Sequence, residues 1–457
     1  MKQQIGELKF LSSNHQAKNS IGNDNLSGTL KIGIAGLGTV GEGVVDLLNK
    51  NHEHILKRTG QNLKLVGLSA RDRSKKRSFK VNDYLWFDNP CDLASSKEID
   101  VFVELIGGSD GIAKESVEVA LTSGKHVVTA NKALIASHGM ELSKIAESNS
   151  SILNFEASVA GGIPIIKLLK ESFVGNKISK IYGILNGTSN YILTQMEKTG
   201  KSFEDVLIEA QSLGYAESDP SFDINGTDTA HKLAVLTSLM TGLPPNLSSI
   251  EVEGIQSISA EDIIFSKKLG FCIKLLGIVS EQNGNYIQRV HPCMVPIKSS
   301  ISRVDDVNNA IFVEGNFVGP VVLEGLGAGA GPTASSVVSD LIDVSKGKNV
   351  LPFGCKLENK EIKLDKDAAR LGPWYIRFKV IDEPGVLAEI AAELKNQSVS
   401  IESVLQRGRA PGECVSLIMT THETEEKKFK AAMQQIQKLK ALAEPPCVIR
   451  IEKLLRN

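Results

Sequence analysis

The chain has 457 residues, of which 42% are apolar and 23% are charged, and its formal net charge is −1. This length suits two or three domains, and the near-zero charge argues against a basic surface for nucleic acid or anionic lipid. No apolar run reaches the roughly 18 residues that a membrane-spanning helix needs. The six cysteines lie far apart without C-x-x-C spacing, so we expect reduced thiols in the cytoplasm and neither a zinc site nor a disulfide framework.

The first 28 residues are polar, rich in Asn and Ser, and contain no Arg. They lack the apolar core of a secretory signal and the arginines of a transit peptide. We expect residues 1–28 to form a disordered tail.

A glycine-rich turn follows the first apolar segment. The stretch "LKIGIAGLGTVGEGVVDLL" contains an apolar strand, a Gly36-x-Gly38-x-x-Gly41 turn and a helical pattern, which is the context of a dinucleotide fingerprint. Gly36 permits the turn, Gly38 lets the backbone approach a pyrophosphate, and Gly41 lets the helix pack on the strand. The N–H groups at the start of the helix, including Thr39 and Val40, would face the phosphates.

The alternation of strands and helices continues after this turn. "LKLVGLSA", "IDVFVELIGG" and "KHVVTANKAL" are typical of strands, and "GIAKESVEVALTSG" between two of them is typical of a helix. This order indicates βαβ units and a parallel sheet. We therefore predict an α/β protein with a Rossmann-type NAD(P)-binding domain over residues 29–155.

The second strand indicates which dinucleotide is preferred. It ends in "SARDRSKKR", where Arg71 stands near the tip, Asp72 comes only after it, and five cations lie among residues 71–77. An acid at the tip favours the ribose hydroxyl of NAD, whereas an Arg suits the 2′-phosphate of NADP. We predict NADP, with use of NAD left open; a solvated basic turn is the alternative. Lys132 in "TANKALI" also follows a strand end, so we expect it near the cofactor or substrate.

An acidic stretch ending in a lysine lies near the middle of the chain. "LGYAESDPSFDINGTDTAHKLAVL" contains Glu217, Asp219, Asp223, Asp228 and Lys232. A solvated acidic loop is the simplest interpretation. A calcium-binding EF-hand does not fit, because Gly226 at the sixth position would put Lys232 at the twelfth, where a Glu is required. An organic cation therefore explains the acids better than a metal.

Six segments resemble the homoserine dehydrogenase family: "GIAGLGTVG", "TANKALIA", "FEASVAGGIPII", "ILNGTSNYIL", "GYAESDPSFDINGTDTAHKL" and "GLGAGAGPTASSVVSDL". They run in family order from about residue 31 to 345. The family reduces L-aspartate 4-semialdehyde to L-homoserine with NAD(P)H, on the route to threonine, methionine and isoleucine. The resemblance implies an α+β substrate-binding and dimerisation domain over residues 156–324, and a return segment at about 325–347 that rejoins the first domain.

The resemblance also assigns roles within the acidic stretch. Lys232 matches the catalytic lysine of the family, and a positioned lysine can polarise a carbonyl and donate a proton to it. Asp228 lies four residues earlier on the same helical face and could orient Lys232 or relay its proton. Glu217 matches the position that binds the substrate ammonium, Asp223 would be a second contact, and Thr188 resembles a substrate-contacting position.

The resemblance further implies a monovalent cation, usually sodium, held largely by backbone carbonyls. The matching positions are Glu156, Val159, Gly161 and Ile163. A glycine turn before a helix is the alternative, because carbonyl ligands leave no side-chain signature. Gly327 and Gly329 belong to a late glycine run that the family places against the cofactor, and a flexible linker is the alternative there.

The C-terminal residues 373–457 show a strand–helix–strand–strand–helix–strand pattern. They resemble an ACT domain of ferredoxin-like fold, and "DEPGVLAEI" is the usual turn of that family. Such domains pair edge to edge and bind amino acids at the interface, which implies a threonine effector and a homodimer or higher homo-oligomer. A purely structural dimer module is the alternative. The charged residues 348–372 are expected to be a linker.

Two competing functions remain. An acylating semialdehyde dehydrogenase needs a cysteine nucleophile with a base nearby, and no such motif surrounds Cys91, Cys272 or Cys293. A non-catalytic nucleotide and amino-acid sensor could share the architecture, although the retained acids and lysine argue against it. His231 is not expected to act chemically, because it adjoins Lys232 and points about 100° away on a helix.

Overall fold

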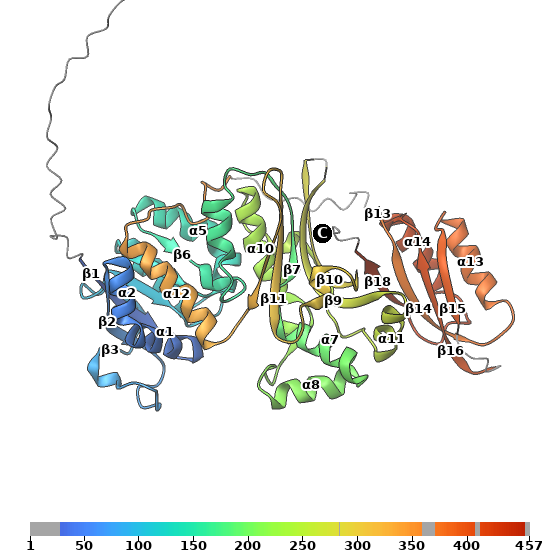
Figure 1. The fold of residues 1–457 in the computed structure, drawn as a ribbon, viewed down its shortest axis with the longest axis horizontal. Coiled ribbons are helices and arrows are strands. Elements are labelled where there is room, and N and C mark those ends of the chain that lie inside the picture. Colours follow the sequence, from blue (N-terminus) through green and yellow to red (C-terminus); the bar gives the residue numbers. More distant parts are fainter. Residues whose placement is uncertain (1–27, 283, 359–370, 407–411, 453–457) are drawn as a thin grey trace, which may run out of the picture.

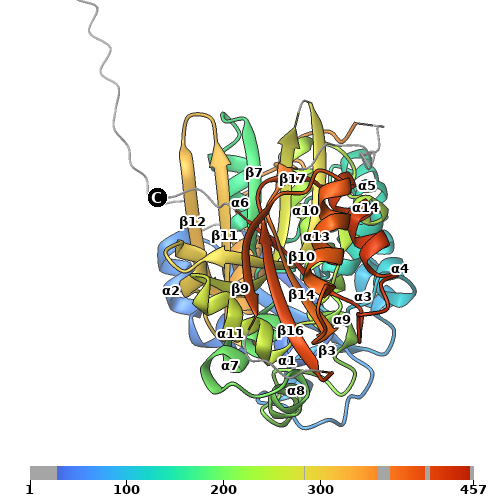
Figure 2. The ribbon, with the colours of Figure 1, turned by 90° about the vertical axis from the view of Figure 1, so that its right-hand side faces the viewer.

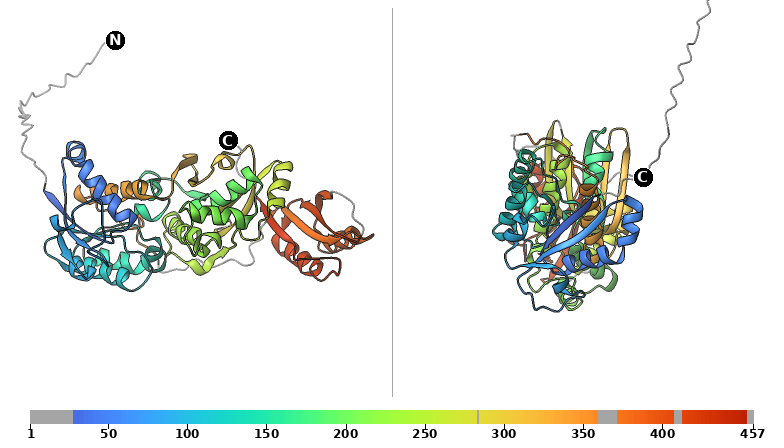
Figure 3. Two further views of the ribbon diagram at one scale, coloured as in Figure 1. Left: turned by 90° about the horizontal axis from the view of Figure 1, so that it is seen from below. Right: turned by 90° about the vertical axis from the view of Figure 1, so that its left-hand side faces the viewer.

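The computed structural model describes residues 28–282, 284–358, 371–406 and 412–452. The predicted tail, apart from its last residue, and residues 359–370 of the predicted linker lie outside these ranges. The described chain forms three parts in a row, which Figure 1 shows from one side and Figure 3 from below.

The first sheet contains six parallel strands in the order β3-β2-β1-β4-β5-β6. Their bounds are β1 (Thr29–Ala35), β2 (Asn62–Ser69), β3 (Leu85–Phe87), β4 (Val101–Glu104), β5 (His126–Thr129) and β6 (Leu153–Asn154). This is the strand order of dinucleotide-binding folds, in which ligands bind beyond the carboxyl ends of the strands where the order reverses. The predicted parallel sheet and Rossmann-type fold are confirmed.

Helix α12 (Ala330–Ser345) packs beside α1 (Thr39–Lys50), as Figure 1 shows in orange and blue. Val337 and Leu341 of α12 share one buried cluster with Val44 and Val45 of α1. The chain thus returns to the first sheet after the middle part, in the region where a return segment was expected.

The second sheet contains ten strands and runs through both remaining parts. Its order is β12-β11-β7-β9-β10-β18-β14-β16-β15, with β8 (Ile250–Val252) also beside β10. The bounds in the middle part are β7 (Ile178–Ile184), β9 (Phe271–Gln282), β10 (Asn285–Pro296), β11 (Asn308–Gly315) and β12 (Gly319–Leu326). Figure 2 shows β11 and β12 side by side at one edge.

One face of the middle sheet carries helices, including α7 (Gly187–Thr199) and α10 (Thr227–Thr241). Gly277 of β9 makes close packing possible here, because an added Cβ would lie 3.1 Å from side-chain atoms of both Leu185 and Thr229. Side chains of a strand alternate between faces, so residues 276, 278, 280 and 282 point to the opposite face.

The C-terminal module has the predicted order of elements: β14 (Trp374–Ile381), α13 (Val386–Asn396), β15 (Ile401–Gln406), β16 (Cys414–Thr421), α14 (Glu426–Ile436) and β18 (Cys447–Ile451). Trp374 stacks on Phe429 with ring centroids 4.2 Å apart, which fixes α14 on the sheet. Strand β18 pairs with β10 in parallel at two positions, Cys293 with Arg450 and Met294 with Ile451. The module is therefore joined to the middle sheet by backbone hydrogen bonding.

The first part of the predicted linker is packed. Phe353 is only 2% exposed and its ring lies 5.1 Å from that of Phe155.

None of the described helices is both long and apolar enough to cross a membrane. All six cysteines are free thiols.

Candidate active site

A buried carboxylate joins two lysines between the first and middle parts. Asp228, in the first turn of α10, places Oδ2 2.7 Å from Nζ of Lys232 and Oδ1 2.9 Å from Nζ of Lys132. Lys132 begins α5 (Lys132–Ser148), which lies beside α10 in Figure 1. The ammonium of Lys232 also donates to the carbonyl of Leu185 at 2.6 Å. The structure thus adds Lys132, which the sequence analysis expected near the cofactor or substrate, to the predicted pair of Asp228 and Lys232.

Burial and charge set different pKa values for these groups. Burial acts against the charge of Asp228, but Lys232 and Lys132 outweigh it and hold the pKa of its carboxyl well below the usual range. Burial lowers the pKa of Lys232, and Asp228 offsets this only in part. Burial also opposes the charge of Lys132, but the attraction of Asp228 prevails and raises its pKa. Of the two lysines, Lys232 is therefore the readier proton donor.

Asn186 connects the two acids of the site. Its Nδ2 donates to Oδ1 of Asp223 and to Oδ2 of Asp228, both at 2.8 Å. Its Oδ1 accepts from the backbone N–H of Ser189 at 2.7 Å and so caps α7. Burial raises the pKa of Asp223. The sequence analysis gave Asn186 no role, although an Asn before a predicted helix signals a cap.

The remaining predicted substrate residues lie at the rim of this site. Thr188 donates its hydroxyl to the carbonyl of Tyr215 at 2.8 Å. Glu217 is exposed and close enough for its charge to act on Lys132. Asp219 accepts from the N–H of Ser221 at 3.1 Å and braces its own loop. The loop around residues 215–219 thus lies near the buried lysines.

The fingerprint turn has the shape that a dinucleotide requires. Gly36 has φ +99°, and a Cβ there would collide with the carbonyl of Leu105. A Cβ at Gly41 would collide with the carbonyl of Gly36, so only glycine lets α1 approach this closely. A Cβ at Gly38 would meet no atom within 4 Å, so space remains open above the turn. The residues present therefore fit a pyrophosphate.

Glu104 links this turn to the lysines, and the sequence analysis missed it. It is fully buried at the end of β4, and its carboxylate accepts from the N–H groups of Ile106 and Gly107 at 2.7 and 3.0 Å. It also accepts from the hydroxyl of Thr129 at 2.5 Å. Asn131, directly before Lys132, donates to Glu104 at 3.5 Å. A buried acid at a strand end was the available signal, since such a group must be fully hydrogen-bonded.

The three arginines of the basic turn after β2 differ in the contacts that their guanidinium groups make. Arg73 donates to Asn82 at 3.2 Å, and both Arg73 and Arg77 lie over the ring of Trp86, at 5.7 and 6.0 Å from its centroid. Arg71 is exposed and makes no hydrogen bond or ion pair with any residue that the structure describes. Of the three arginines in this turn, Arg71 is thus the one whose guanidinium makes no hydrogen bond, ion pair or ring contact within the described part of the loop.

The predicted cation-binding segment is buried and lies against the late glycine run. Its predicted ligands are Glu156, Val159, Gly161 and Ile163. The Glu156 carboxylate accepts from the N–H groups of Ile166 and Lys167 at 2.9 and 2.7 Å, and burial raises its pKa to about 7. A Cβ at Gly161 would lie 2.6 Å from the carbonyl carbon of Gly327. The side chain of Glu156 is thus engaged by backbone N–H groups, and the carbonyl of Gly161 accepts from the hydroxyl of Ser336 at 2.6 Å.

The acids of the stretch 217–228 do not form a metal-binding group. Among the described residues, the group of three His, Cys, Asp or Glu side chains close enough to hold an ion is His291, Cys293 and Glu452, on the second sheet. His231 packs edge-on against Phe222 with ring centroids 5.3 Å apart, and burial lowers the pKa of its imidazole.

Sequence comparisons agree with this geometry. The family model "Homoserine dehydrogenase, NAD binding domain" matches residues 36–156, "Homoserine dehydrogenase" matches 164–342, and "ACT domain" matches 374–441. The homoserine dehydrogenase of Neisseria gonorrhoeae is 41% identical over 433 residues, which cover 93% of this chain and 99% of that protein. The chain belongs to the homoserine dehydrogenase family. The homoserine dehydrogenase of Helicobacter pylori is also 41% identical, over 93% of this chain and 99% of that protein.

Solved homoserine dehydrogenases have the same fold. The crystal structure of the enzyme from Thiobacillus denitrificans aligns with a TM-score of 0.86 and 40% identity over 93% of this chain and 99% of that chain. A hyperthermophilic archaeal homoserine dehydrogenase in complex with NADPH aligns with a TM-score of 0.59 and 30% identity over 71% of this chain and 99% of that chain.

The predicted family and class are confirmed: this homoserine dehydrogenase is an NAD(P)-dependent oxidoreductase with a C-terminal ACT domain. Neither the sensor nor the acylating semialdehyde dehydrogenase is supported.

Proposed function

We propose that this homoserine dehydrogenase reduces L-aspartate 4-semialdehyde to L-homoserine reversibly, with Lys232 as the proton donor. The observation that carries the proposal is the buried chain Lys132–Asp228–Lys232. When bound, the reduced nicotinamide supplies a hydride to the aldehyde carbon. The carbonyl oxygen then requires one proton, which Lys232 donates; in the oxidation of homoserine, neutral Lys232 takes it back.

Lys232 and Lys132 have different roles in the proposed reaction. The lowered pKa of Lys232 eases release of its proton, and its hydrogen bond to the Leu185 carbonyl holds the ammonium in place. The raised pKa of Lys132 keeps its charge, so that it stabilises Asp228 and the negative charge that develops on the carbonyl oxygen. Asp228 positions both ammonium groups.

The substrate ammonium is received by acids that lie near the two lysines. We assign Glu217 and Asp223 to it, and Thr188 to a contact with the polar end of the substrate. Asp223 is half-buried beside Asn186 and within the field of Lys232, which supports a place close to the reacting group. Glu217 is exposed and would close over the ligand from the rim.

The preferred cofactor is NADP, with NAD as a poorer alternative. Residues assigned to the dinucleotide are Gly36, Gly38, Thr39, Val40, Gly41, Arg71, Lys132, Gly327 and Gly329. The unengaged guanidinium of Arg71 at the tip of β2 supports recognition of a 2′-phosphate. The archaeal relative in complex with NADPH is a precedent within the family.

A monovalent cation, sodium, is proposed for the carbonyls of Glu156, Val159, Gly161 and Ile163. Hard cations prefer oxygen donors, and the Ser158 hydroxyl in the same segment is buried without a hydrogen-bond partner. A thermal unfolding scan in NaCl against choline chloride at equal ionic strength tests this without the reaction. A higher midpoint in NaCl is expected, and equal midpoints would contradict the proposal.

The ACT domain is proposed to bind threonine between two chains and so to couple the threonine, methionine and isoleucine route to its product. Its outer strand, β15, has an unpaired edge in the described chain, and Val404 on it is 42% exposed. A homodimer or higher homo-oligomer would also cover exposed apolar residues of β12 such as Val322 and Leu326. A cytoplasmic location stays a prediction.

The decisive assay follows NADPH oxidation with aspartate semialdehyde as substrate. Turnover that requires both compounds is expected. NADPH binding without turnover would contradict the proposed reaction and would leave the protein as a sensor.

A further inference from the structure

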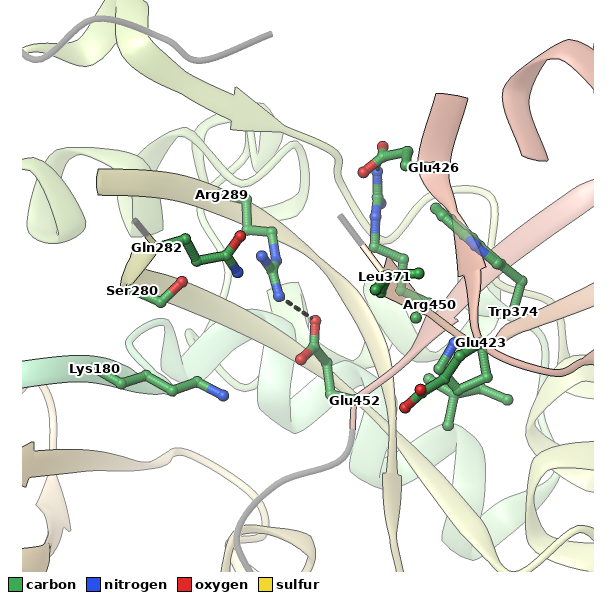
Figure 4. A pocket seen from close by; sticks show the side chains of 13 residues that line it. Lys180, Ser280, Gln282, Arg289, Leu371, Trp374, Glu423, Glu426, Arg450 and Glu452 are labelled. Atoms are coloured by element: carbon green, nitrogen blue, oxygen red, sulfur yellow. Dashed lines mark hydrogen bonds and ion pairs between the residues drawn. The ribbon is translucent and has the colours of Figure 1, made fainter. Parts of the chain in front are cut away.

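A cavity of about 290 Å³ lies where the middle sheet meets the ACT domain (Figure 4). Its middle-sheet wall includes Lys180 of β7, Ser280 and Gln282 of β9, and Arg289 of β10. Ser280 and Gln282 point away from the α10 face, because side chains alternate along β9. The cavity therefore lies on the opposite face of the sheet from the Lys132–Asp228–Lys232 site.

The middle-sheet wall carries one cation, Lys180, which Glu452 attracts only from beyond ion-pair distance. Lys180 makes no hydrogen bond or ion pair with any described residue, and its ammonium lies 5.1 Å above the Tyr182 ring. Burial lowers the pKa of Lys180. Figure 4 shows this ammonium pointing toward Arg289 and Glu452, which are joined at 2.6 Å. An anion beside Lys180 would offset the cost of burying its charge.

Neutral donors stand beside that cation. The side chains of Ser280 and Gln282 also make no hydrogen bond with described residues and line the same side of the cavity in Figure 4. Together with Lys180 they form a polar corner suited to a carboxylate. Glu452 adds a carboxylate to the same cavity, so a positive group, Lys180, and a negative group, Glu452, both line it.

The opposite wall combines apolar side chains, Leu371 and Trp374, with the charged side chains of Glu423, Glu426 and Arg450. Leu371 lines the cavity and is 67% exposed. Trp374 lies between the ring of Phe429 and the guanidinium of Arg450, whose Cζ is 4.9 Å from the centroid of the Trp374 ring. The charge of Arg450 is already compensated, since it contacts Glu253 at 2.9 Å and Glu426 at 3.0 Å. The apolar surface beside it thus remains available to an uncharged side chain.

We propose that this cavity binds a free α-amino acid with a small uncharged side chain. Its carboxylate contacts Lys180 and Ser280, its ammonium contacts Glu452, and its side chain lies against Leu371 and Trp374. The volume is near the lower end of the roughly 300–1,000 Å³ typical of small-molecule sites, which suits a ligand of this size.

This site lies within one chain and is separate from a site between paired ACT domains. Interchain pairing would use the outer strand β15, whereas the cavity lies at β18, where the ACT sheet joins β10. A ligand held by both walls spans the two-position β10–β18 junction, and it alters activity if it favours one arrangement of that junction. The inference requires neither ACT pairing nor the proposed role of Lys232.

The test is isothermal titration calorimetry of the full chain with L-threonine, L-isoleucine and L-methionine. We expect at least one of them to bind, and its amide, which lacks the carboxylate, to bind at least about tenfold more weakly, as loss of one charged hydrogen bond implies. Lys180→Met should weaken binding by about tenfold or more, and Ser280→Ala by a smaller factor. Lys177→Met is the matched control, because Lys177 is an exposed lysine just before β7 and outside the cavity.

Val404→Lys on β15 separates the two sites. Binding that persists in Val404→Lys and is lost in Lys180→Met places the ligand in the cavity. No binding of any probe, equal affinity in wild type and Lys180→Met, or loss in Val404→Lys alone would each overturn the inference. Each variant is also assayed for NADPH oxidation without added amino acid, where activity close to wild type is expected. Failure of the proposed reaction would appear there and not in the titrations.

Discussion

The ammonium of Lys232 and the carboxylate of Asp228 form a 2.7 Å ion pair one helical turn apart on α10, and both residues are less than 10% exposed. An ion pair this deeply buried is costly unless further partners satisfy it. Lys132, Asn186 and the Leu185 carbonyl supply those partners. A charged group retained in such surroundings, with its pKa displaced, is typical of a catalytic centre.

Replacing Lys232 tests its role as proton donor. Lys232→Ala should lower kcat by a factor of about 10² or more, because general acid catalysis contributes this much, while NADPH binding stays intact. Lys198→Ala, at an exposed lysine paired with Asp306 at 3.2 Å, is the control and should keep wild-type turnover. Turnover of Lys232→Ala within threefold of wild type would rule out the assignment.

The pH dependence follows from the lowered pKa of Lys232. Reduction needs the protonated lysine, so its kcat should fall as pH rises through a pKa below the ordinary lysine value. Oxidation of homoserine needs the neutral lysine and should rise over the same range. Asp228→Asn removes the charge that favours the ammonium, so the inflection should move to lower pH. Profiles of both directions for both proteins check this, and an inflection unmoved in Asp228→Asn would contradict it.

Glu217→Gln tests recognition of the substrate ammonium. The variant keeps the shape and removes the charge, so KM for homoserine should rise about fivefold, a modest factor because Glu217 is exposed. The affinity for NADP should not change. Asp219→Asn is the control, since Asp219 only braces its loop through Ser221. Equal losses for both ligands would indicate a folding defect.

Arg71→Ser tests the preference for NADP. The substitution should raise KM for NADPH about tenfold and leave KM for NADH unchanged, because only NADPH carries a phosphate for the guanidinium. Arg73→Ser is the matched control, as Arg73 is engaged by Asn82 and Trp86 within the loop. An unchanged NADPH/NADH ratio in Arg71→Ser would show that the basic turn is only solvated surface.

Local patterns were sufficient to predict the elements that carry the chemistry. The glycine turn at Gly36 predicts a backbone conformation that other residues rarely adopt. The four-residue spacing of Asp228 and Lys232 predicts that they share one helix face. The resemblance then gave these residues their roles.

Contacts between distant segments were not predictable in this way. Lys132 meets Asp228 only because α5 and α10 pack together, and no local pattern records that packing. The same holds for the ACT domain, because the charged residues 348–372 were expected to be a linker that separates it from the rest of the chain. Asp262 of the middle part is fully buried and accepts hydrogen bonds from Tyr375 at 2.9 Å and Arg377 at 2.8 Å. A truncation before Leu371 would leave that carboxylate without these partners and uncover an edge of β10, so it is a poor test of regulation.

A substitution on the outer ACT strand tests regulation with less damage to the fold. Val404→Lys places a charge on the exposed face of β15, where a second ACT domain would pair, and leaves the β10–β18 junction intact. If threonine binds between paired ACT domains, this variant should keep NADPH oxidation within about twofold and lose threonine inhibition, because an effector acts only through a site that distinguishes two states. Val404→Thr, which keeps a β-branched side chain, is the control and should remain inhibited. Activity against threonine concentration, with sedimentation velocity on each protein, provides the measurement. An unchanged inhibition midpoint in Val404→Lys would place the effector elsewhere, and an unchanged sedimentation coefficient would show that β15 does not hold the chains together.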